Sequence, residues 1–211
     1  MPDGQTGALS ALVCISCCLS EQREMRYAIE AQPTSSPVAM DFRLDQLRRD
    51  LDSAVDGMSA EQLSWHPPGK WCASEVLEHL YLTYTGTIRG FGKVIASGKP
   101  QASLPSVVHR MRTLVVVGCG YMPAGRQAPA MTRPKGLAAE KVLGELGAKI
   151  AAMDALISQC EDRFGRRVRV LDHPILGPLS ATQWRKLHLV HGRHHKKQLL
   201  RLRERTTGQK D

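Results

Sequence analysis

The stretch that decides the fold is SATQWRKLHLVHGRHHKKQLLRLRER, which runs from Ser180 to Arg205 and has the length of one long helix. It opens with a Ser-x-x-Gln capping pattern at Ser180 and Gln183, which predicts where that helix begins. On a helical wheel of 100° per residue, an aromatic residue, histidines and leucines share one arc, which should face the interior. That arc contains Trp184, His188, His191, His195, Leu199 and Leu202. Arg185 and most of the other basic residues fall on the opposite, exposed arc.

Three uses would explain these histidines: a metal site, a basic surface for nucleic acid, or packing. A nucleic-acid surface would use the Lys/Arg arc, and the histidines point away from it. A buried polar group without a partner costs about 1–3 kcal/mol, so several histidines on one stripe need an explanation. His191 and His195 are four residues apart, so their rings can converge on one ion. His188, one turn earlier, is open to three roles: a ligand, a partner that supports a ligand, or a packing residue. His194 falls at the border.

A metal site needs a third ligand from another helix. His79 lies at the edge of the apolar arc of an earlier predicted helix and is the leading candidate, although a border position alone suits an ordinary surface histidine. His66 lies in a loop and is a weaker candidate. His109 and His173 lie in poorly patterned segments and are not predicted to take part.

Three further long helices are predicted by apolar residues spaced three and four apart. They cover residues 41–58, 71–98 and 137–164. Glu75 and Glu78 fall on the polar arc of the second. Residues 107–117 fit a helix or a strand, of which we expect a short helix, and residues 165–179 fit a structured loop or a short extended piece. Four main helices and little strand predict an all-α fold, a four-helix bundle.

The ends of the chain differ in character from its middle. We expect residues 1–39 to form a disordered or weakly ordered tail, residues 40–206 the bundle domain, and residues 207–211 a disordered C-terminus. The apolar run at 8–20 is too short and too polar to span a bilayer, and the residues before it lack the Lys or Arg of a secretory signal. Six scattered cysteines without a disulfide framework indicate a cytoplasmic protein.

The motifs resemble those of the DinB-like superfamily of four-helix bundles. PPGKWCASEVLEHL resembles its W-[ST]-x-x-E-x-x-x-H-L motif through Trp71, Glu75 and His79, and GYMPAGRQAPAMTRP resembles the Gly/Pro loop of one subgroup. HPILGPLSATQWRKLHLVHGRHHKKQL is similar to the last motif of that subgroup, whose function is unknown. The resemblance implies a metal triad of His79, His191 and His195. Imidazole ligands favour ions of borderline softness, so zinc or nickel is the expected ion. Cys72, where the family has Ser or Thr, and the additional His188 depart from the pattern.

The resemblance also implies a range of activities. Family members include transferases that join low-molecular-weight thiols to electrophiles, hydrolases and isomerases, so we expect a metal-dependent transferase or hydrolase. The alternative is a non-enzymatic, metal-binding or stress-related bundle. The expected partners are a small-molecule substrate and a low-molecular-weight thiol cosubstrate, with a possible homodimer. The net charge of +9 is typical of proteins that bind nucleic acid. With 5% aromatic residues and no recognised motif, however, we expect no specific nucleic-acid binding. We also expect no membrane partner.

Overall fold

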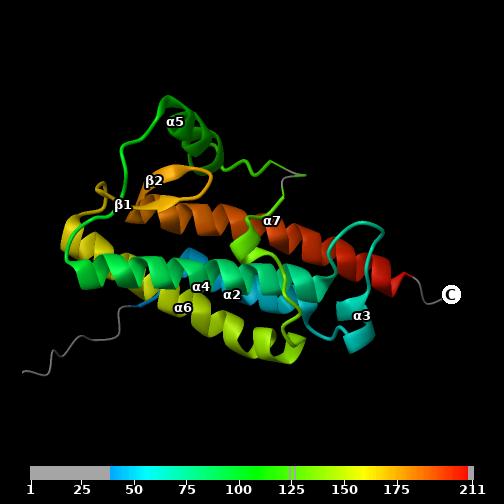
Figure 1. Cartoon of the computed structure of the whole chain (residues 1–211). Coiled ribbons are helices and arrows are strands. Elements are labelled where there is room, and N and C mark those ends of the chain that lie inside the picture. The colour runs from blue at the N-terminus through cyan, green and yellow to red at the C-terminus, as the bar shows by residue number, and fades with distance from the viewer. Residues whose placement is uncertain (1–38, 124, 126, 209–211) are drawn as a thin grey trace, which may run out of the picture. The chain divides into compact units, whose positions relative to one another are not determined.

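The computed structural model describes residues 39–123, 125 and 127–208 (Figure 1). These residues belong to one compact unit, Ala39–Asp211. The predicted tail, with its apolar run and its Cys14-x-x-Cys17 spacing, lies outside the described residues except for Ala39, as do the last three residues of the chain.

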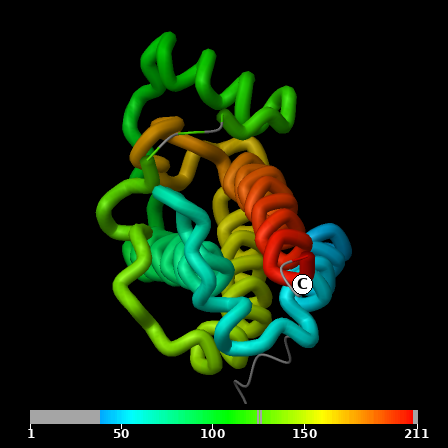
Figure 2. Tube along the Cα trace, turned by 90° about the vertical axis from the view of Figure 1, so that its right-hand side faces the viewer, coloured from blue at the N-terminus to red at the C-terminus, as the bar shows by residue number. Residues whose placement is uncertain are grey.

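Four long helices build the unit, and the prediction of an all-α bundle is confirmed. They are α2 (Phe42–Val55), α4 (Ala73–Ser97), α6 (Ala139–Phe164) and α7 (Ala181–Thr207). In Figure 2 they appear nearly end-on, with α4 beside α6 and α2 beside α7. A short helix, α3 (Ala60–Ser64), follows α2 and begins with a capping box of Ser59 and Gln62.

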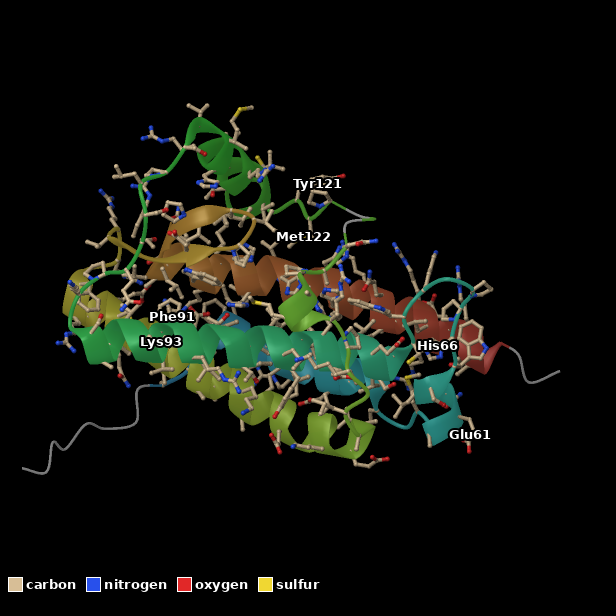
Figure 3. All side chains as sticks on the ribbon, viewed as in Figure 1. Glu61, His66, Phe91, Lys93, Tyr121 and Met122 are labelled. Atoms are coloured by element: carbon tan, nitrogen blue, oxygen red, sulfur yellow. The ribbon has the colours of Figure 1, made fainter. Side chains whose placement is uncertain are left out.

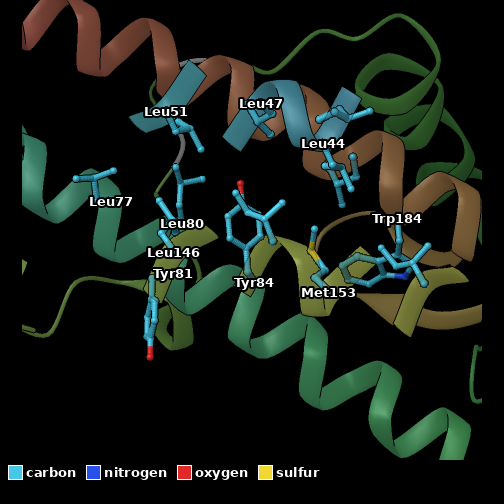
Figure 4. Packing of buried hydrophobic residues seen from close by; sticks show 14 of the residues in the cluster. Leu44, Leu47, Leu51, Leu77, Leu80, Tyr81, Tyr84, Leu146, Met153 and Trp184 are labelled. Carbon is cyan, nitrogen blue, oxygen red and sulfur yellow. The ribbon is translucent and has the colours of Figure 1, made fainter. Parts of the chain in front are cut away.

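The core is made of aliphatic side chains from all four helices, as the low aromatic content requires. Figure 4 shows leucines of α2 and α4 facing Leu146 and Met153 of α6, with Trp184 of α7 at one end. Tyr84 of α4 is completely buried, whereas Tyr81, one turn away from it, turns its hydroxyl outward and donates to Glu145 Oε2 at 2.7 Å. Burial of this apolar surface is the main force that holds the helices together.

Helices α2 and α7 pack against each other at a glycine. A Cβ added to Gly192 would lie 2.4 Å from Cδ2 of Leu47, well inside van der Waals contact. The absence of a side chain at Gly192 therefore lets Leu47 fill the space beside the histidine pair of α7.

The connection between α4 and α6 contains the expected short helix. It consists of α5 (Val107–Thr113), which continues into a π-helical turn, η1 (Leu114–Gly118), and is followed by a 3₁₀ turn, η2 (Ala130–Thr132). The segment between α6 and α7, for which a loop or a short extended piece was expected, is an antiparallel hairpin of β1 (Arg169–His173) and β2 (Gly177–Ser180). Trp184 Nε1 donates to Leu171 O of this hairpin at 3.1 Å, so the strand pair is fixed to α7.

The prediction that Arg185 lies on an exposed basic arc was wrong. Its guanidinium is buried and donates to Asp154 at 2.6 Å and to Glu161 at 2.7 Å, both on α6. Asp154 also accepts a hydrogen bond from the backbone N–H of Asp41 at the start of α2, at 2.7 Å. A wheel drawn for α7 alone cannot show that α6 packs over this part of the basic arc and supplies carboxylates there. None of the described helices is both long enough and apolar enough to cross a membrane.

Candidate metal centre

The start of α4 determines which way the His79 side chain points. The first turn of α4 is fixed by Glu75, whose carboxylate accepts the backbone N–H of Cys72 at 3.0 Å. His79 follows one turn later, on the side of α4 that faces α7, and is 5% exposed. The indole of Trp71 lies 5.2 Å from the His79 ring, measured between centroids.

The structure brings His79, His191 and His195 together. His191 and His195 occupy successive turns of α7, and their Nε2 atoms are 2.9 Å apart. The Nε2 atom of His79 is 3.1 Å from that of His191. The three ligand nitrogens all lie within 4.8 Å of one another and form a group that could hold a metal ion.

Hydrogen bonds on the far side of two rings fix which nitrogen is free. Nδ1 of His79 lies 2.7 Å from the carbonyl oxygen of Thr132, which only accepts, so Nδ1 carries the proton. Nδ1 of His195 is held in the same way by Oε1 of Gln198 at 2.7 Å. In the neutral rings, both Nε2 atoms therefore present lone pairs toward His191, which is the arrangement that metal-binding histidines require.

The electrostatics of the group favour neutral rings. Burial, together with the positive charge that a protonated His79 would carry, lowers the pKa of His195 to about 3. Burial also lowers the pKa of His191 well below its ordinary value, again helped by His195 and His79. The pKa of His79 is lowered by burial as well, against a smaller opposing effect of the Thr132 carbonyl. At neutral pH protons do not compete for these nitrogens, so the donor set fits a divalent ion of borderline softness.

His188 lies one turn before His191 and is not a member of the group. Its Nε2 donates to Thr87 Oγ1 at 3.1 Å, and its ring stacks on Trp184 with centroids 5.7 Å apart. Its Nδ1 is buried and has no hydrogen-bond partner among the described residues. The structure thus gives His188 a packing contact and a bond to Thr87.

The remaining histidines lie elsewhere. His66 is exposed at the α3 end of the molecule (Figure 3), where its Nε2 contacts the Glu75 carboxylate at 2.9 Å. With Cys72 these two form a second group of potential ligands, which the capping of α4 and the His66–Glu75 pair already explain. His194 contacts Gln198 Nε2 at 3.3 Å, and His173 accepts backbone hydrogen bonds within the hairpin.

The sequence analysis missed Glu78. It was placed on the polar arc of its helix, but its side chain is buried, with 2% of the residue exposed. Its carboxylate accepts three backbone N–H groups, from Lys135, Gly136 and Leu137, at 2.7, 3.0 and 3.2 Å. The loop before α6 covers this side of α4, and helical periodicity holds no information about a loop with no repeating pattern.

The fold and the site together define a class of protein, namely helical bundles with a group of three histidines in their interior. The chain matches the DinB superfamily over residues 43–199, from the start of α2 to near the end of α7, and it belongs to this family. Searches among curated proteins and among solved structures found no match.

Proposed function

We propose that this protein is a divalent-metal-dependent enzyme that transfers a low-molecular-weight thiol to a small electrophilic substrate, or hydrolyses such a substrate. The observation that carries the proposal is the convergence of three neutral imidazole nitrogens. Hydrogen bonds at Nδ1 fix the tautomers of two of these rings, His79 and His195. Zinc or nickel is the expected ion, because both accept imidazole ligands.

The number of ligands favours an enzyme over a metal-stabilised scaffold. Structural zinc sites are closed by four protein ligands, whereas catalytic sites keep one position for water or substrate. In the part of the chain that the structure describes, the group has three members and no fourth His, Cys, Asp or Glu within the same distance. One coordination position would therefore stay available to a substrate.

A divalent ion in this position would supply one chemical property: it lowers the pKa of a thiol or water that binds to it, so that a nucleophile exists at neutral pH. The residues of the chain do the rest. His79, His191 and His195 remain neutral and hold their lone pairs inward, while Thr132 O and Gln198 keep two of the rings in orientation.

The thiol of a transfer reaction would come from a cosubstrate. Of the cysteines that the structure describes, Cys72 and Cys160 are buried and Cys119 is exposed, and none belongs to the histidine group. Burial raises the pKa of the Cys160 thiol to about 11, which keeps that thiol protonated and unreactive.

The test begins with metal analysis of the full chain, purified without a polyhistidine tag. We expect one divalent ion per chain in the wild type and a loss of most of it in His79→Ala, His191→Ala and His195→Ala. His66→Ala is the matched control, because it removes an exposed histidine near the start of α4 that does not belong to the group of three. Equal metal content in all variants would contradict the proposal.

Activity is then measured with a chromogenic electrophile in the presence of a low-molecular-weight thiol, and with a chromogenic ester in its absence. A metal-dependent rate in the first assay indicates a transferase, and one in the second a hydrolase. Metal binding without either rate, over a broad set of substrates, would favour the non-enzymatic alternative.

A further inference from the structure

Glu78 connects the backbone loop before α6 to the helix that carries His79. Both carboxylate oxygens are in use, because Oε1 accepts the N–H of Lys135 and Oε2 accepts those of Gly136 and Leu137. A carboxylate that accepts several backbone N–H groups is held strongly, since hydrogen bonds to a charged group are stronger than neutral ones. Glu78 therefore fixes this loop relative to α4.

The same loop carries the hydrogen-bond acceptor for His79. Thr132 ends the 3₁₀ turn η2 and is separated from Lys135 by only Arg133 and Pro134. Its carbonyl oxygen lies 2.7 Å from Nδ1 of His79. The neighbouring residues Glu78 and His79 thus contact the loop at two points, one through the carboxylate and one through the imidazole.

We propose that Glu78 is a positioning residue, which acts through the loop and Thr132 O to keep the His79 proton on Nδ1 and its Nε2 free toward His191 and His195. The proposal rests on the function proposed above. Without the carboxylate, three N–H groups of the loop lose their charged acceptor, so the loop is no longer held against α4 and is free to move. The Thr132 carbonyl would move with it, and the His79 ring would then exchange between tautomers and orientations.

Two variants of the full chain separate this role from general stability. Glu78→Gln keeps the shape of the side chain but turns an NH₂ toward N–H donors. Glu75→Gln removes a charge one turn earlier on the same helix, where it serves the start of α4 and His66. Thermal melting of both confirms folding. The affinity for Zn²⁺ is measured by competition with a chelating indicator, and the His79 tautomer by imidazole ¹⁵N shifts in the metal-free protein.

We expect Glu78→Gln to weaken Zn²⁺ binding by about tenfold or more, as for other partners that orient metal-binding histidines. Its His79 signals should move away from the pure Nδ1–H tautomer, while Glu75→Gln keeps wild-type values of both. A wild-type affinity or an unchanged tautomer in Glu78→Gln would overturn the proposal. If the wild type binds no metal but the tautomer still shifts, the proposed function is wrong and the positioning of His79 by Glu78 stands.

A second inference rests on the outer surface of α5 and η1, independently of the histidines. In Figures 1 and 2 this segment lies beyond the hairpin, away from α6. One side of it is anchored, because Val116 and Val117 are buried and Thr113 Oγ1 donates to Leu176 O at 3.3 Å. The other side presents large apolar side chains to solvent, and we name it the apolar stripe. It consists of Val107 (74% exposed), Val108 (53%), Met111 (65%), Leu114 (63%) and Val115 (41%), together with Leu104 (92%) in the loop just before α5.

The stretch of sequence that contains the apolar stripe carries charge of one sign. Between His79 and Ala139 the sequence contains no Asp or Glu, and Arg110 and Arg112 lie within α5 itself. The other basic residues of this interval are Arg89, Lys93, Lys99, Arg126, Arg133 and Lys135. From outside the interval, Asp172 of the hairpin accepts the N–H of Ser103. Tyr121, at the end of the segment, also points outward (Figure 3) and is 60% exposed.

In place of the expectation of no membrane partner, we infer that α5 and η1 bind the surface of an anionic lipid membrane, with the apolar stripe inserted among the acyl chains and the arginines beside the headgroups. A helix with an apolar face and basic flanks is the arrangement that lies in the plane of such an interface. A second copy of the chain fits less well, because apposing two identical segments would bring arginines together without an acidic residue of the same segment to pair them.

The test is co-sedimentation of the full chain with vesicles of phosphatidylcholine, with or without phosphatidylglycerol. We expect binding only with the anionic lipid, and weaker binding as salt is raised. Arg110→Gln/Arg112→Gln should lower the partition coefficient about thirtyfold, from the usual attraction of two basic residues to anionic lipid. Met111→Glu/Leu114→Glu should abolish binding, while the control Phe42→Glu/Leu200→Glu, which changes two exposed apolar residues elsewhere, should keep it.

Three results would overturn this inference. The first is wild-type protein that stays in the supernatant with anionic vesicles, and the second is Met111→Glu/Leu114→Glu protein that still sediments with them. The third is light scattering that shows a wild-type dimer and a monomeric Met111→Glu/Leu114→Glu variant, because the apolar stripe would then be the contact between two copies.

Discussion

The orientation of His195 depends on one neighbouring side chain. Gln198, three residues later on the same helix, accepts the Nδ1 proton of His195 through its oxygen and contacts His194 through its nitrogen. The spacing of His191 and His195 was enough to predict that the two would lie together, because both are on one helix. Glu78 and Arg185 were placed wrongly, because their environment is set by a loop and by another helix that no local pattern describes.

At this scale we predict that Gln198→Ala weakens Zn²⁺ binding by about tenfold, since nothing then keeps the proton of His195 on Nδ1. His194→Ala is the control on the same turn, and it leaves the oxygen of Gln198 in place. Competition with a chelating indicator measures both variants. Equal affinities of Gln198→Ala and the wild type would show that Gln198 does not orient His195.

Among the elements, three helices meet at one buried carboxylate. Asp154 of α6 binds the Arg185 guanidinium of α7 and the N-terminal backbone of α2, so a single side chain connects three members of the bundle. The four helices themselves were predictable, because each has apolar residues spaced three and four apart along one face. The hairpin could not be predicted, because the alternation of polar and apolar residues at 167–170 is too short, and no turn signature is strong enough, to decide between strand and loop.

We predict that Asp154→Ala lowers the free energy of unfolding by about 3 kcal/mol, because the buried guanidinium of Arg185 loses one of its two carboxylate partners. Asp50→Ala is the matched control: its partner Lys196 lies 2.9 Å away, but both side chains are about a third exposed, and the loss should stay below about 1 kcal/mol. Urea denaturation at neutral pH measures both changes. A smaller loss for Asp154→Ala than for Asp50→Ala would contradict the proposed role.

The whole molecule should respond to acid through its buried histidines. Burial lowers the pKa of His188 from 6.5 to about 3 and that of His173 from 6.5 to about 4. As the pH falls below about 6.5, these histidines bind protons in the unfolded chain but stay neutral in the folded chain. The stabilisation that comes from these neutral histidines is therefore complete above about pH 6.5 and is lost progressively toward pH 3–4.

We predict that metal-free protein loses about 2 kcal/mol of stability through His188 alone between about pH 7 and about pH 5, a window in which most carboxylates stay ionised. His188→Gln should show a flatter dependence of unfolding free energy on pH, because glutamine does not titrate. Urea denaturation at the two pH values gives the comparison. An identical slope in the variant would mean that His188 is protonated equally in both states.

The contact between Gly192 and Leu47 limits how this site can diverge. A side chain at Gly192 would collide with Leu47, so a mutation to alanine there requires Leu47 to shift or to become smaller. Shortening Leu47 would relieve the collision at a cost in packing. A lineage that gains a side chain at Gly192 is expected to change Leu47 as well. Inheritance at these two positions, one on α2 and one on α7, is therefore coupled.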